Sequence, residues 1–129
     1  MFRLGLGWDS KEVKRRFVIL ILWTLILLSL LLSPIAETQI PSPWGFKHFD
    51  KVAHFGLFFV TGLVGVFSTR FLSQFRTRML FGIVFGLFLA VSTEFAQSLI
   101  PLRNTSFYDL FADIAGLGVA LALCAFIHR

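Results

Sequence analysis

Four long apolar runs divide the chain, and each is close to the length of a membrane-spanning helix. They cover residues 17–33, 52–69, 79–100 and 110–127. About 17–25 apolar residues cross the hydrocarbon core of a bilayer as a helix. A helix also satisfies its own backbone hydrogen bonds, which lipid cannot do. The pattern therefore predicts an all-α polytopic membrane protein, built as a bundle of four transmembrane helices.

Composition supports lipid as the solvent of this chain. The sequence has 129 residues, 57% of them hydrophobic, with 17 Phe and a mean hydropathy of +0.82. A soluble domain of this size could not bury so much apolar surface. The net charge of +5 is explained by basic residues that flank the apolar runs, so we expect membrane lipids and no nucleic acid as partners. The single cysteine, Cys124, excludes an internal disulfide.

The first apolar run also has features of a secretory signal peptide, because basic residues precede it. The run is long for a signal peptide, however, and Pro34 would occupy the −3 position of the only nearby small-residue cleavage site. We therefore expect the run to be retained. The predicted organisation is a basic cytoplasmic tail over residues 1–16 and one transmembrane domain over residues 17–129.

Lys and Arg are distributed unequally between the two sides of this predicted topology. Lys47, Lys51 and Arg103 lie on one side. The other side holds nine: Arg3, Lys11, Lys14, Arg15, Arg16, Arg70, Arg76, Arg78 and Arg129. Because basic residues concentrate on the cytoplasmic side, we expect both termini in the cytoplasm of a bacterium and the protein in its inner membrane. The loop over residues 34–49, which contains Trp44, then faces outward at the headgroup level.

Polar side chains recur at one depth of the predicted bundle. His54, Glu94 and Asp113 each lie inside an apolar run, roughly 5–9 Å below its outer boundary at 1.5 Å per residue. On each helix the polar residue shares a stripe with small residues such as Gly86 and Gly116, which mark close helix contacts. A charged residue at a helix centre in lipid costs roughly 2.5–3.5 kcal/mol, so such residues are functional candidates.

Several short motifs occur in order between the predicted helices. They are Asp50-Lys51-x-x-His54, Glu94-x-x-Gln97 and Pro101-x-Arg103, followed by Ser106, Asp109, Asp113 and Gly116. Over about residues 20–127 the chain resembles the VanZ-like membrane proteins, a family named for a protein associated with teicoplanin resistance. Asp113 stands where that family more often has Asn, which makes this site more acidic. The resemblance implies a cell-envelope role at the outer face and brings no established reaction with it.

The main functional hypothesis is binding of an anionic headgroup in an outward-facing polar pocket. Arg103 offers a planar fork for phosphate or carboxylate, which suits a membrane lipid or a lipid-linked cell-wall precursor, with an effect on glycopeptide susceptibility. The predicted ligand-binding residues are Asp50, Lys51, His54, Glu94, Gln97, Arg103, Ser106, Asp109 and Asp113. We expect at least one carboxylate to pair with Arg103, because an unpaired buried charge is costly.

Other interpretations of these residues stay open. Asp50, Asp109 or Ser106 could cap helices, as short polar side chains do at helix N-termini. His54, Glu94 and Asp113 are also candidate catalytic residues of an intramembrane hydrolase or transferase, by acid–base catalysis or with a divalent metal. No sharper spacing supports a metal, so we predict no metal and no cofactor. Gly82-x-x-x-Gly86 fits helix packing within the bundle better than a dimer contact, and the oligomeric state is not predicted.

Overall fold

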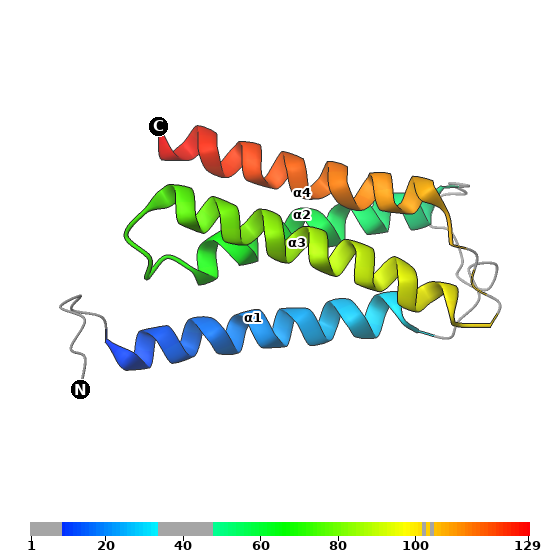
Figure 1. The fold of residues 1–129 in the computed structure, drawn as a ribbon, viewed down its shortest axis with the longest axis horizontal. Coiled ribbons are helices and arrows are strands. Elements are labelled where there is room, and N and C mark those ends of the chain that lie inside the picture. The colour runs from blue at the N-terminus through cyan, green and yellow to red at the C-terminus, as the bar shows by residue number, and fades with distance from the viewer. Residues whose placement is uncertain (1–8, 34–47, 102, 104) are drawn as a thin grey trace.

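The computed structural model describes residues 9–33, 48–101, 103 and 105–129 of the chain. They form four helices that run up and down in sequence, so that α1 begins and α4 ends at the same end of the bundle (Figure 1). The helices are α1 (Ser10–Leu31), α2 (Phe49–Ser68), α3 (Phe75–Ser98) and α4 (Phe107–His128). The prediction for the loop around Trp44 lies outside the described residues.

The predicted all-α fold is confirmed, and three of its helices are long and apolar enough to cross a membrane: α2, α3 and α4. Their outward faces carry large apolar side chains, with Phe88, Phe95 and Phe126 each about two-thirds exposed or more. Such surfaces need lipid around them. The protein is therefore a multi-pass membrane protein.

Helix α1 differs from the other three because its first turns are charged. It begins at Ser10, inside the tail that the sequence placed before the first span, and Asp9 caps it by accepting a hydrogen bond from the Lys11 amide at 3.0 Å. The basic residues that follow shorten the apolar part of the helix to residues 17–31. The amphiphilic start is typical of a helix that emerges from the membrane surface.

Helix α2 lies at the centre of the bundle and contacts all three others. Its approach to α4 is the closest, since a Cβ atom added at Gly116 would lie only 2.1 Å from the carbonyl oxygen of Phe55. A Cβ at Gly62 would lie 2.8 Å from that of Ala120. Small residues permit such backbone contact between membrane helices, and they set the register that brings the starts of α2 and α4 together.

The two glycines of the Gly82-x-x-x-Gly86 motif pack inside the bundle, as predicted. A Cβ at Gly82 would lie 3.1 Å from both Val66 and Leu121, and one at Gly86 would lie 2.5 Å from Leu117. Helix α3 therefore approaches α2 and α4 through these positions.

Hydrogen bonds attach α1 to α2 and α3 along its length. The Trp23 indole donates to Thr61 Oγ1 of α2 at 2.9 Å, near the middle of the helix. The Gln97 amide of α3 donates to the Leu31 carbonyl oxygen at 2.7 Å, at the end of α1. In a medium without water each of these hydrogen bonds contributes about 1 kcal/mol to stability. Apolar packing around Leu27 also holds α1 against the bundle.

Candidate functional site

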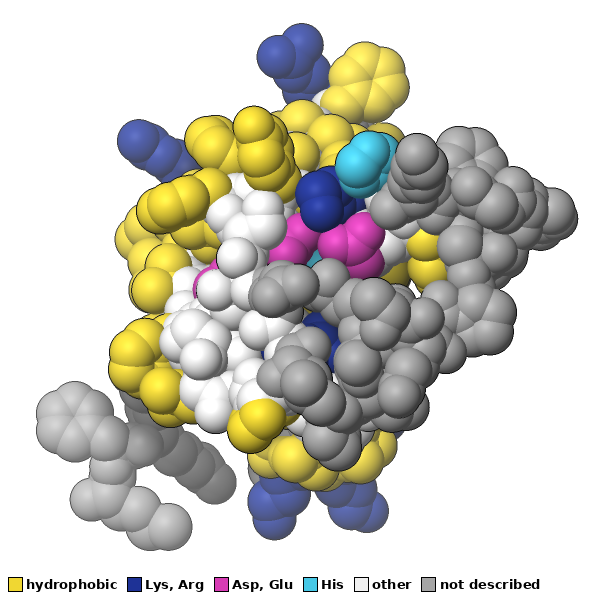
Figure 2. All heavy atoms as spheres, turned by 90° about the vertical axis from the view of Figure 1, so that its right-hand side faces the viewer, with side chains coloured by type: hydrophobic (Ala, Val, Ile, Leu, Met, Phe, Trp, Pro, Cys, Tyr) yellow, Lys and Arg dark blue, Asp and Glu magenta, His cyan; other side chains and the backbone are white. Residues whose placement is uncertain are grey.

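Charged and polar side chains gather where α2 and α4 begin and α3 ends. Figure 2 views this end of the bundle and shows acidic, basic and histidine side chains near its centre, with apolar side chains around the rim. We call the group the polar cluster. It consists of Asp50, Lys51, His54, Glu94, Asp109 and Asp113.

His54 is the centre of the cluster and joins all three helices. Its Nδ1 lies 2.8 Å from Asp113 Oδ1 on α4, within hydrogen-bond distance, and 3.7 Å from Glu94 Oε1 on α3. His54 is 4% exposed and Asp113 is fully buried. The predicted convergence of these three residues inside the bundle is therefore confirmed, and neither carboxylate faces lipid.

Lys51 connects the buried part of the cluster with its surface. The ammonium group lies 3.1 Å from Asp50 Oδ2 and 3.3 Å from Asp109 Oδ1. The side chains of Lys51 and Asp50 are about 30% exposed, whereas that of Asp109 is 2% exposed. Asp50 and Asp109 both lie in the first turn of their helices, where a negative charge is favourable, but neither is the capping residue.

The cluster contains more carboxylates than positive partners. Three of its buried carboxylate oxygens have no hydrogen-bond partner in the described part of the chain: Glu94 Oε1, Asp109 Oδ1 and Asp113 Oδ2. Asp109 Oδ1 is close to Lys51, but that contact is an ion pair without the geometry of a hydrogen bond. Buried oxygens without a donor each cost about 1–3 kcal/mol, so this arrangement calls for a further positive or donating group.

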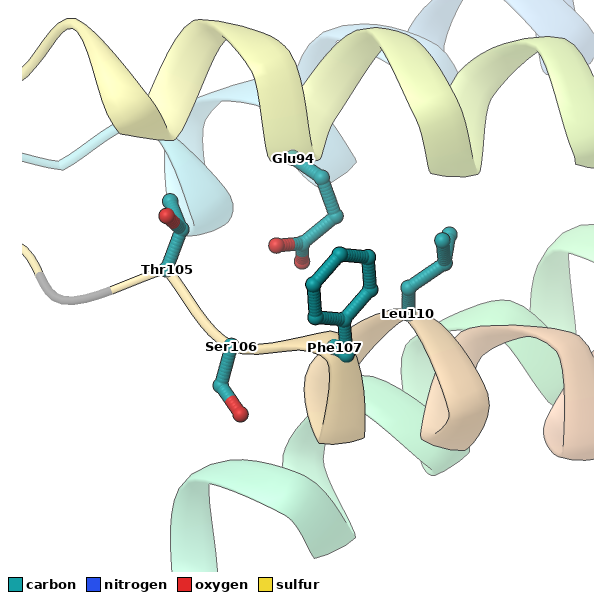
Figure 3. Close-up of a pocket in the computed structure, with 5 residues that line it drawn as sticks. All are labelled: Glu94, Thr105, Ser106, Phe107 and Leu110. Atoms are coloured by element: carbon teal, nitrogen blue, oxygen red, sulfur yellow. The ribbon is translucent and has the colours of Figure 1, made fainter.

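A pocket of about 180 Å³ opens beside the cluster, between the end of α3 and the start of α4. Figure 3 shows the Glu94 carboxylate pointing from α3 toward the segment that leads into α4. The residues that line the pocket are Glu94, Thr105, Ser106, Phe107 and Leu110. Of the nine predicted ligand-binding residues, Glu94 and Ser106 line this pocket, whereas the buried His54 and Asp113 do not.

Arg103 does not pair with a carboxylate as the sequence predicted. Its Nη1 donates instead to the Ser33 carbonyl oxygen at 3.1 Å, and no carboxylate among the described residues lies within ion-pair distance. The reason is its position after α3, beside the end of α1, where free carbonyl groups need donors. The ion-pair prediction is therefore wrong for the described part of the chain.

Gln97 and Ser106 also have partners that sequence reasoning did not assign. Gln97 is 2% exposed and donates to α1, as described above, so it fastens one helix to another. Ser106 caps α4, because its hydroxyl oxygen accepts a hydrogen bond from the Tyr108 amide at 3.1 Å. The cap interpretation that the sequence left open is thus correct for Ser106, which also lines the pocket.

Sequence reasoning missed the other pocket-lining residues, namely Thr105, Phe107 and Leu110. The one sequence feature that could have indicated them is their position around the first turn of α4, next to the predicted Ser106. None of the three is ionisable, whereas ionisable side chains inside apolar runs were the feature that singled out His54, Glu94 and Asp113.

The arrangement can hold a cation or move a proton. Ligand atoms of His54, Glu94 and Asp109 all lie within 4.8 Å of one another, which is the grouping expected of a metal site. The sequence considered Asp113 as the third ligand. In the structure the third acid of this group is Asp109, while Asp113 lies one turn further along α4 and contacts His54. Without a metal, His54 and its carboxylate neighbours have the composition of an acid–base pair.

Comparisons with known proteins give limited guidance about this site. No family model matches the chain, and no solved structure matches it. One similar protein is an uncharacterized protein of Schizosaccharomyces pombe, 37% identical over 82 residues. The match covers 62% of this chain and 49% of the yeast protein, so the chain spans about half the length of the curated relative. These comparisons assign no family. The chain is a multi-pass membrane protein with a buried polar cluster at one end of its bundle.

Proposed function

We propose that this protein binds the polar headgroup of a lipid in the pocket beside the polar cluster. The observation that carries the proposal is Glu94, a carboxylate on a membrane-spanning helix that lines an open pocket and lies 3.7 Å from the buried His54. Ionisable residues inside membrane helices are costly, and they mark binding or transport sites.

The headgroup in this proposal carries a phosphate together with amine or hydroxyl groups. Lys51 is partly exposed at the same end, and among the described residues only one of the five N–H donors of Arg103 is used, in its bond to Ser33. Both would face a phosphate. The carboxylates of the cluster would accept hydrogen bonds from amines or hydroxyls. A lipid-linked cell-wall precursor has this chemistry, and the resemblance to VanZ-like proteins supports an envelope role with an effect on glycopeptide susceptibility.

The proposed topology has α1 as a fourth span and both termini in the cytoplasm of a bacterium. Support comes from the apolar part of α1 and from the excess of basic residues at the end where α1 begins and α4 ends. Since one relative is a yeast protein, the bacterial inner membrane rests on the VanZ-like resemblance alone. Reporter fusions after Arg129 and within residues 34–47 test the topology. A C-terminal fusion active on the outer side would put the pocket on the cytoplasmic side.

Headgroup binding can be tested with the purified full chain in detergent. Native mass spectrometry would measure retention of phosphatidylethanolamine, phosphatidylglycerol and undecaprenyl pyrophosphate. We expect one lipid per chain to be retained and Glu94→Gln to weaken retention by about tenfold, the effect of losing a charged hydrogen bond of about 1.4 kcal/mol. Glu12→Gln, the same change at the other end, is the matched control. Equal retention by all three proteins would contradict the proposal.

A second function is favoured by the pair of His54 Nδ1 and Asp113 Oδ1 at 2.8 Å. A histidine oriented by a buried carboxylate, next to Glu94 in the pocket, has the parts of an acid–base catalyst that activates water. This alternative is an intramembrane hydrolase or transferase acting on a lipid phosphate. Hydrolysis of undecaprenyl pyrophosphate to undecaprenyl phosphate and inorganic phosphate by the native protein, lost in His54→Gln, would favour it over simple binding.

A further inference from the structure

We propose that His54, Glu94 and Asp109 hold a divalent cation at the base of the headgroup pocket. The proposed role of the ion, recognition of a headgroup, rests on the proposed function. Binding of the ion itself does not, because it needs no lipid. Each of the three ligands comes from a different membrane-spanning helix, α2, α3 and α4. An ion here would therefore join all three.

The distances between ligand atoms are close to those around one ion. Metal–ligand distances of about 2.0–2.2 Å place neighbouring ligand atoms roughly 3–4 Å apart. His54 Nδ1 and Glu94 Oε1 are already 3.7 Å apart. The three ligand atoms lie within 4.8 Å of one another, so small side-chain rotations would complete the first coordination shell on this side.

Buried carboxylate oxygens that accept no hydrogen bond give a second line of support for a bound cation. Asp109 is 2% exposed and Asp113 is fully buried, yet each has one carboxylate oxygen without a hydrogen bond among the described residues. The same holds for Glu94 Oε1. Carboxylates buried together without donors are strongly unfavourable. A divalent ion would remove most of that cost.

Asp113 would change its contact when an ion binds His54 Nδ1. Asp113 Oδ1 lies 2.8 Å from this nitrogen, and both side chains are buried. A ring nitrogen that binds a metal cannot also donate to a carboxylate, so Asp113 would exchange this hydrogen bond for a contact with the ion. Lys51 would move from Asp109 toward Asp50, with which it already pairs at 3.1 Å.

One imidazole and two carboxylates favour a borderline ion such as Mn²⁺, Fe²⁺ or Zn²⁺ over Ca²⁺, which takes oxygen ligands. Three protein ligands would fill only part of the coordination sphere, and one of them, Glu94, also lines the pocket. A lipid phosphate could occupy that open side. The ion would then explain how an acid-rich cluster recognises an anionic headgroup.

Ion binding should be measured on the purified, lipid-free full chain in detergent. After chelator treatment and its removal, Mn²⁺ and Zn²⁺ are titrated by isothermal calorimetry, and Mn²⁺ binding is followed by electron paramagnetic resonance. We expect one saturable site per chain and a higher melting temperature with the ion. Glu94→Gln and Asp109→Asn should each weaken binding by at least about tenfold, since loss of an orienting partner alone costs about 10–100-fold.

Glu12→Gln provides the control, because Glu12 is a half-exposed acid at the opposite end. It should bind the ion like the native protein. Circular dichroism without metal shows whether each variant is folded. If a variant fails to fold, the melting temperature of the native protein with and without Mn²⁺ or Zn²⁺ still decides the matter. Absence of saturable binding by the native chain would overturn the proposal, as would equal weakening in Glu12→Gln.

The same titration separates this inference from the headgroup proposal. Absence of saturable ion binding, together with lipid retention that persists undiminished in a chelator, overturns the cation site and leaves headgroup binding standing. Saturable ion binding without retention of any of the lipids supports the site and overturns headgroup binding. Retention that requires Mn²⁺ or Zn²⁺ supports both.

Discussion

The two ends of the helix bundle both carry charged side chains, but they give those charges different partners. At one end the polar cluster places three acids and a histidine in the interior, facing one another. At the opposite end Arg16 donates to the Phe67 carbonyl oxygen at 2.8 Å and pairs with Glu12, while Arg78 donates to the Leu72 carbonyl oxygen at 2.8 Å. The arginine charges there meet backbone and surface groups.

Helix ends explain why the second arrangement is undemanding. The last carbonyl groups of a helix lack donors and carry partial negative charge, so arginines from neighbouring segments satisfy them. Only a neutral hydroxyl, Ser68 Oγ, is buried there without a hydrogen bond among the described residues. The comparison teaches that a charge near a membrane surface does not identify a site. Several acids buried next to one another do identify a candidate site, because such a costly arrangement is retained when it has a function.

The largest effect on stability is expected from a substitution where α2 and α4 touch, because this contact assembles the polar cluster. Gly116→Val would push a side chain into the Phe55 backbone, so we expect a loss of about 3 kcal/mol or more in the free energy of unfolding. Gly118→Val is the matched control, because no atom lies within 4 Å of its added Cβ. Unfolding in detergent, followed by circular dichroism, measures both. Similar losses would contradict the backbone contact.

The next effect compares one ion pair from each end. Lys51→Met leaves the buried Asp109 without its positive partner, and we expect it to cost roughly 1–3 kcal/mol, less than a fully buried pair because Lys51 is partly exposed. Glu12→Gln at the other end breaks a pair with a half-exposed acid and should cost about 0.5 kcal/mol or less. Unfolding in the presence of a chelator gives both values. Equal losses of stability would mean that the ion pairs at the two ends contribute alike, which contradicts the comparison.

A smaller effect on stability distinguishes a binding site from a structural ion cluster. Glu94→Gln and Asp113→Asn each remove one negative charge from a cluster with too few positive partners. We expect the free energy of unfolding to change by less than about 1 kcal/mol, or to rise, while lipid retention weakens. Melting curves and native mass spectrometry on the same samples test this. Stability and retention falling in proportion would favour a purely structural cluster.

The smallest effect on stability is expected from Arg103→Lys. The described contact of Arg103 is a single hydrogen bond to Ser33, which an ammonium group can also donate, so the unfolding free energy should change by about 0.5 kcal/mol or less. A bidentate phosphate contact would be lost with the planar fork. Retention of phosphatidylglycerol should therefore fall while the melting temperature stays constant. Unchanged retention would exclude Arg103 from the headgroup site.

The apolar runs predicted the helices well because a membrane helix leaves a long, nearly uninterrupted signal. The polar residues were also placed correctly at one end, since an up-and-down bundle brings the start of α2, the end of α3 and the start of α4 together. The pattern was less informative about α1. Its charged first turns look like a tail in sequence, whereas Asp9 caps them into the helix.

Partner choice within the cluster could not be predicted, because it depends on distances of a few ångströms. Sequence spacing placed Asp109 and Asp113 on one face of α4, and only the packing shows that Asp113 holds His54 while Asp109 meets Lys51. Arg103 was expected among carboxylates and instead meets a backbone carbonyl group.

The sequence by itself determined that this chain is a helical membrane protein with ionisable residues near one end, because hydropathy and residue depth are properties of each segment alone. The tertiary structure decided which acids face each other, that Gly116 lets α2 and α4 touch, and that Glu94 reaches a pocket. Those features depend on side chains from separate helices meeting in three dimensions. Periodicity along one helix specifies a face, but not what packs against it.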